Sequence, residues 1–202
     1  MSDALLFIGT RTASGLAAGL AAELQEAPAV AFDPAWSSGP LLEEWRSKLL
    51  ARPPFAGVVV AMWPDSPRPS LLVDLDLDGW VGQFETRFAL WFAALAAGSD
   101  RCAGDGQVIA VVDRPDPMQG AGWATEAAVA DAVENMVRSF AQIHHPRGVR
   151  VNLVTTPART TAAEPASVDE VEDSLVGAVT MLLSGQDAGL TASVVHLPGR
   201  PR

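Results

Sequence analysis

The stretch from Gly106 to Pro157, GQVIAVVDRPDPMQGAGWATEAAVADAVENMVRSFAQIHHPRGVRVNLVTTP, decides the fold. It contains a β-branched run at 108–112, a loop rich in proline and glycine, apolar residues at helical spacing over 123–143, and a second β-branched run at 149–155. A strand, a helix and a strand in this order form a right-handed crossover, which requires a parallel sheet. The stretch therefore predicts an α/β fold.

The bulk composition narrows the class of protein. A chain of 202 residues that is 49% hydrophobic can bury the core of one α/β domain, so we expect a single domain over 1–202. The net charge of −10 argues against nucleic acid or an anionic membrane as partner, because both need a basic face. Cys102 is the only cysteine, and no signal-peptide pattern or membrane-spanning run is present. We therefore expect a soluble, cytoplasmic protein.

The N-terminus has the pattern of a nucleotide-binding turn. A short apolar strand is followed by Gly9-Thr-Arg-Thr-Ala-Ser-Gly15 and an Ala/Leu-rich helix, whose free amides and dipole would face a pyrophosphate. Gly9, Arg11 and Gly15 are therefore candidate cofactor-binding residues, although close packing of helix and sheet also explains the two glycines. Asp33 ends the next predicted strand, 29–32, and is either a ribose ligand or the N-cap of the following turn.

Two predicted helices, 79–97 and 123–143, carry broad apolar stripes. Part of each stripe must cover the sheet, but two such helices in one small domain favour an oligomer. The candidate interface residues recur at spacings of three and four and are Phe84, Phe88, Trp91, Phe92, Val129, Val133, Met136, Val137 and Phe140.

An acidic stretch, DLDLD, precedes the first of these helices. Alternation places Asp74, Asp76 and Asp78 on one side. Neither a histidine nor a glycine-containing calcium loop accompanies them, so we interpret the stretch as a solvated loop and expect no metal site.

The chain as a whole resembles the short-chain dehydrogenases/reductases. Gly9 and Gly15 match the first and third glycines of the motif TGxxxGxG, while Ala13 replaces the middle one. The AAV of 127–129, followed by RSFA, RGVRVN and a proline, resembles the family's active-site helix and the strand after it. The resemblance implies a three-layer α/β/α Rossmann-type sandwich with a mostly parallel sheet. It is shortened by about one strand and one helix, so that 29–32 is either the family's second strand or its third.

The catalytic residues that the resemblance would imply are absent. The family's Tyr exchanges the substrate proton, its Lys lowers the pKa of that phenol, its Ser orients the carbonyl and its Asn supports the relay. In this chain the position of the family's Ser is occupied by Asp113, that of the Tyr by Gly122, that of the Lys by Glu126 and that of the Asn by Arg87. The chain contains no tyrosine, and Lys48, its only lysine, belongs to another predicted helix. We therefore expect no catalytic residue of the family's kind.

Two further departures affect the cofactor pocket. The family's NNAG edge is replaced by Ala61, Met62, Trp63 and Pro64, and the Trp could fill the nicotinamide site. Glu126 reverses a charge beside the expected ribose. The resemblance implies that Arg87 pairs with a nearby acid instead of supporting a relay.

The function implied by the resemblance is that of a non-catalytic subunit. Similar families include degenerate subunits that pair with working ones, some in the breakdown of CoA thioesters. We expect a hetero-oligomer, up to a heterotetramer, with a catalytic short-chain dehydrogenase docked on helices 79–97 and 123–143, and with NAD(P) bound by the partner and not by this chain.

Two other functions stay open. One is an active NAD(P)-dependent oxidoreductase that binds the cofactor at its N-terminal turn and uses carboxylates near the strand ends for acid/base chemistry. The other is a homomer that binds a nucleotide or small ligand without hydride transfer. The first alternative would bind the cofactor through Gly9, Arg11, Gly15 and Asp33 and use Asp113 or Glu126 for the chemistry. Asp116 could cluster with these two carboxylates at the strand ends.

Overall fold

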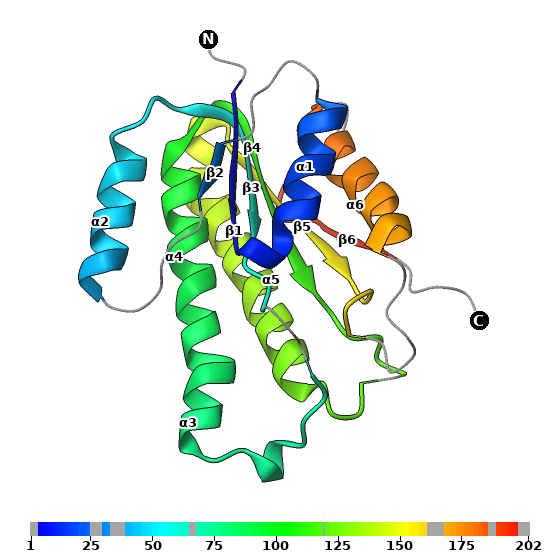
Figure 1. Cartoon of the computed structure of the whole chain (residues 1–202). Helices are drawn as coiled ribbons and strands as arrows, with labels where there is room; N and C mark the ends of the chain where they lie inside the picture. Colours follow the sequence, from blue (N-terminus) through cyan, green and yellow to red (C-terminus); the bar gives the residue numbers. More distant parts are fainter. Residues whose placement is uncertain are drawn as a thin grey trace.

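The computed structural model describes residues 4–24, 30–32, 39–64, 68–118, 120–160, 168–185 and 189–197. These residues form one six-stranded sheet with helices on both faces (Figure 1). Each face of the sheet has its own cluster of buried apolar side chains. Within the described ranges, no helix is both long enough and apolar enough to cross a bilayer.

The sheet is parallel throughout, which confirms the predicted fold class. Its order is β2-β1-β3-β4-β5-β6, and every neighbouring pair is parallel. The chain first moves outward from β1 to β2 and then returns to the other side of β1 with β3. The strands are β1 (Leu5–Gly9), β2 (Val30–Phe32), β3 (Phe55–Ala61), β4 (Cys102–Asp113), β5 (Arg150–Thr156) and β6 (Val194–His196).

The helices cover the two faces unequally. Helices α1 (Ser14–Glu23) and α6 (Val168–Leu183) lie on one face, while α2 (Gly39–Leu50), α4 (Thr86–Arg101) and α5 (Ala124–His144) lie on the other (Figure 1). The period of two along β1 decides which residues meet which layer: Leu6 and Ile8 pack toward α4 and α5, and Leu5 and Phe7 toward α1 and α6. Strands buried on both faces are nearly continuously apolar for this reason.

The position of β2 shows which strand is missing. In a Rossmann sheet the second strand lies beside the first and the third lies outside it. Strand β2 lies directly beside β1, in the register Leu6 to Val30, and no described residue occupies the place beyond it. The strand at 30–32 therefore takes the second position, and the shortening removes the third.

The helix predicted over 79–97 is longer than expected and irregular at its start. It begins with α3 (Leu77–Trp80), whose N-cap Asp76 accepts a hydrogen bond from the Gly79 amide at 2.8 Å. A π-helical turn, Val81–Glu85, then leads without a break into α4. Helix α3 and the first half of α4 project beyond the sheet (Figure 1).

Six of the nine predicted interface residues are buried inside the chain, and this corrects the prediction for them. Trp91 is only 1% exposed, because α4 and α5 must cover the central strands. Phe88 and Phe92 are 42% and 54% exposed, and Phe84 is partly buried. The six buried residues are Trp91, Val129, Val133, Met136, Val137 and Phe140.

Candidate functional site

The carboxyl ends of the parallel strands are where ligands bind in such sheets, at the point where the strand order reverses. Here that point lies between β1 and β3. Gly9 ends β1, and a 3-10 turn, Arg11–Ala13, leads into α1. A Cβ on Gly9 would lie 2.4 Å from the Phe7 ring, so this glycine is required by packing. The turn retains its predicted architecture.

Two other predicted cofactor residues, Arg11 and Gly15, lie at the surface of the turn. Arg11 is exposed, and Gly15 is partly exposed in the first turn of α1. Ala13, at the place of the family's middle glycine, is completely buried. Asp33 lies outside the described residues.

Trp63 occupies the space just beyond β3. The Thr10 hydroxyl, which follows β1, donates to the Trp63 carbonyl at 2.7 Å. The Trp63 indole Nε1 donates to the Val111 carbonyl of β4 at 2.9 Å, and the side chain is 8% exposed. The residue therefore ties together the ends of three neighbouring strands and covers them with its indole.

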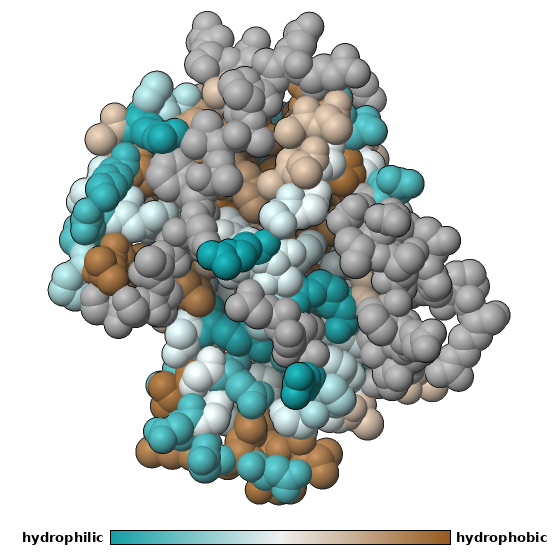
Figure 2. Space-filling model, viewed as in Figure 1, coloured by the Kyte–Doolittle hydropathy of each residue, from teal (hydrophilic) through white to brown (hydrophobic). Residues whose placement is uncertain are grey.

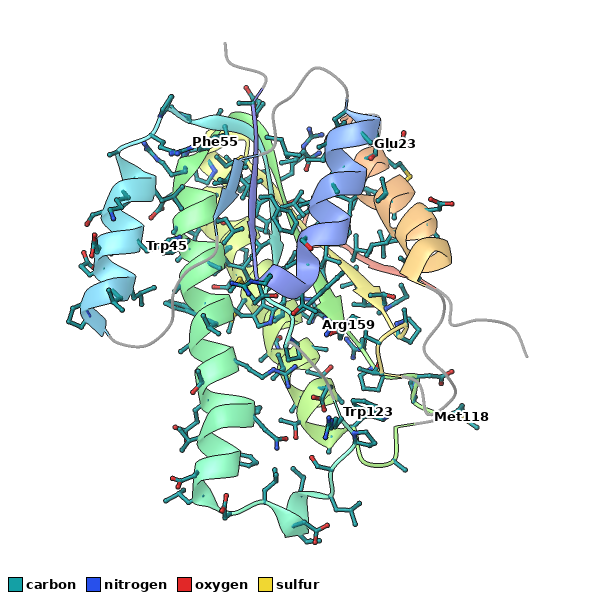
Figure 3. All side chains as sticks on the ribbon, in the orientation of Figure 1. Glu23, Trp45, Phe55, Met118, Trp123 and Arg159 are labelled. Carbon is teal, nitrogen blue, oxygen red and sulfur yellow. The ribbon has the colours of Figure 1, made fainter. Side chains whose placement is uncertain are left out.

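Arg159 follows β5 in the chain and lies near the same strand ends (Figure 3). Its guanidinium lies 5.1 Å from the centroid of the Trp63 ring and donates to the Pro64 carbonyl. Its Nη1 is 3.4 Å from Asp113 Oδ2, which is close enough for an ion pair although the two groups are not aligned as a hydrogen bond. Arg159 was not predicted as a site residue, because its partners Trp63, Pro64 and Asp113 lie at the ends of other strands.

A second ion pair joins α4 to α5. Glu126 lies in the first turn of α5, where a carboxylate is favourable to the helix dipole. Arg87 Nη1 donates to Glu126 Oε1 at 2.9 Å, and the two side chains are 13% and 5% exposed. Arg87 thus pairs with an acid, and that acid stands at the place of the family's Lys.

Two of the three predicted carboxylates influence each other. Burial raises the pKa of Asp113 to about 6, the charges of Arg159 and Arg87 act to lower it, and that of Glu126 to raise it. Asp116 lies in the following turn, where its Oδ1 accepts a hydrogen bond from the Met118 amide at 2.8 Å. No contact among the described residues joins Asp116 to Asp113 or Glu126, so the grouping of all three stays a prediction.

Gly122, at the place of the family's Tyr, has no room for a side chain. It precedes α5 with a φ of 81°, which is a left-handed conformation. A Cβ there would lie 2.9 Å from the Pro69 Cβ, and the Gly122 carbonyl accepts a hydrogen bond from the Ser70 amide at 2.7 Å. The segment around Pro69 thus closes the place where a tyrosine would stand.

Several buried polar atoms in this region lack a hydrogen-bond partner among the described residues. They are both carboxyl oxygens of Asp113, the Thr125 hydroxyl, the Trp123 indole nitrogen and Arg87 Nε. Such atoms are where ordered water or a small polar molecule binds. Within the described part of the chain, no group of three or more His, Cys, Asp or Glu side chains is placed to hold a metal ion. The region can hold protons, water and buried charge.

These residues do not fit a nicotinamide dinucleotide that extends over the strand ends. A nicotinamide ring beside the crevice between β1 and β3 would meet the Trp63 indole and the Arg159 guanidinium, which are held by interactions on three strands. The buried methyl of Ala13 stands where the family's middle glycine lets the phosphates approach.

Comparison with known proteins shows the fold. No family model matches the sequence, and no curated protein matches it. A short-chain dehydrogenase/reductase from Serratia marcescens is similar over 97% of this chain and 96% of its own, with a TM-score of 0.70 and 16% identity. A dehydrogenase/reductase from Sinorhizobium meliloti is similar over 98% and 94%, with a TM-score of 0.71 and 16% identity.

A third structure contains a cofactor. An oxidoreductase of the short-chain dehydrogenase/reductase family from Brucella ovis, solved with a partially ordered NAD, is similar over 96% of this chain and 100% of its own, with a TM-score of 0.64 and 17% identity. The chain therefore has the fold of the short-chain dehydrogenases/reductases over nearly its whole length.

Proposed function

We propose that this chain is a non-catalytic member of the short-chain dehydrogenase/reductase family that pairs with a catalytic dehydrogenase of the same fold. In the complex, the partner binds NAD(P) and this chain binds none. The observation that carries the proposal is the pair of buried ion pairs, Arg87 with Glu126 and Arg159 with Asp113, at the positions where the family's proton relay would lie.

The chemistry of these pairs opposes hydride transfer. Reduction of a carbonyl needs a group that donates a proton to the developing alkoxide and a positive charge that stabilises it. In this chain each guanidinium is already engaged by a carboxylate, and Gly122 leaves no side chain that could carry the proton. Four charges that neutralise one another inside the fold support a structural role for this end of the sheet.

Exposed apolar side chains of α4 support pairing with another subunit. Phe88 and Phe92 of α4 are 42% and 54% exposed, so this helix keeps an apolar surface outside the core. A subunit of the same fold could cover this surface with its own helices, giving a heterodimer or a heterotetramer. A CoA thioester is the substrate class that we propose for such a complex.

One observation favours a second candidate, an active oxidoreductase with an atypical acid. Asp113 combines a pKa of about 6 with two oxygens that lack hydrogen-bond partners among the described residues, which are properties of a general acid or base. In this alternative Asp113 replaces the tyrosine, and NAD(P) binds to this chain.

Co-expression with an intact short-chain dehydrogenase encoded beside this chain separates the two candidates. The proposal predicts a complex in which Asp113→Asn and Glu126→Gln of this chain leave kcat within about twofold, whereas removal of the partner's catalytic tyrosine lowers kcat by at least about 10³-fold. Circular dichroism of each variant checks that it is folded. A loss of about 10²-fold or more in kcat with Asp113→Asn in a folded complex would establish the oxidoreductase instead.

A further inference from the structure

The segment that leads into α4 exposes a group of apolar side chains. The largest exposures are those of Val73 at 88% and Leu77 at 75%. Figure 2 shows apolar residues gathered at the end of the molecule where Figure 1 places α3, with hydrophilic residues between them. We call this surface the α3 patch; its residues are Leu71, Leu72, Val73, Leu77, Trp80 and Val81.

The α3 patch is continuous with the exposed face of α4. The ring of Trp80 lies 5.0 Å from that of Phe84, which is 6.5 Å from that of Phe88. This aromatic row crosses the π-helical turn, an irregularity that is frequent at functional sites. Apolar side chains exposed together in this way mark a surface that another molecule covers.

Acidic side chains surround the α3 patch. Asp74, Asp78 and Glu85 are exposed, and none of them forms an ion pair with another described residue. Arg87, two residues after Glu85, is already paired with Glu126, and Arg68 stands three residues before the patch begins. The patch therefore presents an apolar centre within a rim of acids that form no ion pair among the described residues.

The charge pattern of the α3 patch indicates which kind of molecule can bind it. A second copy related by a twofold axis through the patch would place the same acids opposite each other, which is unfavourable. An anionic bilayer surface attracts basic segments and would repel this rim. A protein with an apolar helical face flanked by lysine or arginine complements both the centre and the rim.

We propose that the α3 patch is the docking site for a basic, apolar helical surface of a different protein. The inference deepens the proposed function, on which it rests, by assigning the chemistry of the partner's face. The partner subunit presents aliphatic side chains to Leu77 and Trp80, and its cations lie opposite Asp74, Asp78 and Glu85.

The test uses two labelled helical peptides as probes for the purified chain. Both have the same leucine face, which is flanked by lysines in one peptide and by glutamates in the other. In about 50 mM salt we expect the lysine peptide to bind at least about tenfold more tightly, and we expect the ratio to fall below about threefold in about 0.5 M salt. Fluorescence anisotropy measures both affinities.

Substitutions in the α3 patch test whether the lysine peptide binds there. Leu77→Ser together with Val73→Ser should weaken the lysine peptide by about tenfold or more, and Asp74→Lys together with Asp78→Lys should reverse the preference between the peptides. The matched control is Met118→Ser, because Met118 is 90% exposed and lies in the loop after β4. This control should bind like the unmodified chain.

Equal binding of both peptides, or binding that the serine variants leave unchanged, would overturn the proposal. So would a homodimer, seen by sedimentation, that dissociates when Leu77 and Val73 are replaced by serine. Failure of the proposed function is a separate result: there no mixed complex forms with the dehydrogenase. A mixed complex that tolerates the serine variants would overturn only the assignment of the α3 patch.

Discussion

The carboxyl end of the sheet and the α3 patch contain the same kinds of side chain, but these side chains are buried and paired in the first region and exposed in the second. At the sheet end Trp63 is 8% exposed and hydrogen-bonded, whereas Trp80 in the α3 patch is 39% exposed. Asp113 and Glu126 face arginines, while Asp74 and Asp78 face solvent without an ion-pair partner among the described residues. In this chain the strand ends, where the family's catalytic site would lie, are covered by buried side chains, whereas the α3 patch is exposed.

The difference has an energetic basis. A buried ion pair contributes little net stability, because desolvation of both charges offsets their attraction, but the loss of one partner is costly. Exposed acids and apolar side chains cost the free chain little and become favourable when a complementary surface covers them. The two regions should therefore respond very differently to the same substitutions.

Replacing each tryptophan by alanine gives the largest expected contrast. Trp63→Ala should lower the free energy of unfolding by about 3–5 kcal/mol, because it leaves a cavity over the strand ends. Trp80→Ala should change it by less than about 1 kcal/mol. Urea denaturation of the two variants measures both values, and similar losses would contradict the assignment of Trp63 to the core.

Breaking the buried ion pair should have the next largest effect. Arg87→Met leaves the Glu126 carboxylate buried without its counter-ion and should cost about 3 kcal/mol, while Arg87→Met with Glu126→Leu should recover most of that loss. Arg138→Met is the surface control, since Arg138 is 52% exposed, and should cost under about 1 kcal/mol. If the double variant is no more stable than Arg87→Met alone, the pair does not act as a unit.

Asp113→Asn should change how stability depends on pH. The folded pKa of about 6 lies above the ordinary carboxyl pKa of 3.8, so the folded state binds the proton more tightly than the unfolded state. The carboxyl therefore favours folding below about pH 4, and that contribution is lost as the pH rises toward 6. Relative to the unmodified chain, Asp113→Asn should gain about 2–3 kcal/mol between pH 4 and pH 7.

Denaturation curves at several pH values measure this gain. Glu134→Gln is a useful control, because Glu134 pairs with Arg114 and Arg138 and its charge is not among those that shift the pKa of Asp113. A stability difference between Asp113→Asn and the unmodified chain that stays constant from pH 4 to pH 7 would show that Asp113 is not the buried, proton-binding group described here.

The smallest effect on stability is expected in the α3 patch. Leu77→Ser should change the free energy of unfolding by less than about 0.5 kcal/mol, because the side chain is 75% exposed. The same substitution should still weaken the mixed complex. A large loss of stability in the free chain would mean that the patch belongs to the fold and not to an interface.

The local pattern of the sequence was enough to predict the fold. The helix predicted over 123–143 is Ala124–His144 in the structure, because its apolar spacing and the flanking breakers are encoded in neighbouring residues. The strand β4 begins at Cys102, earlier than predicted, because Gly104 and Gly106 are typical of turns and not of strands. Periodicity could not separate core from surface on α4, because its apolar stripe is wide. Trp91 on one side of the stripe is buried, whereas Phe92 on the other side is exposed.

The site was predicted less completely, for a physical reason. The replacement of the relay residues was expected from the resemblance, and so was an acidic partner for Arg87, which is Glu126 in the structure. Arg159 could not be found, because its contacts with Trp63 and Asp113 exist only once three strands lie side by side. The left-handed backbone of Gly122 likewise depends on the approach of Pro69.

The most direct test of the central claim is native mass spectrometry of this chain co-expressed with an intact short-chain dehydrogenase from the same organism. It reports the mass of the complex and the number of cofactors bound in a single measurement. A mixed complex with one NAD(P) for each pair of unlike chains is the predicted result. A homomer of this chain that carries one NAD(P) per chain would contradict the claim and would identify the chain as a cofactor-binding protein in its own right.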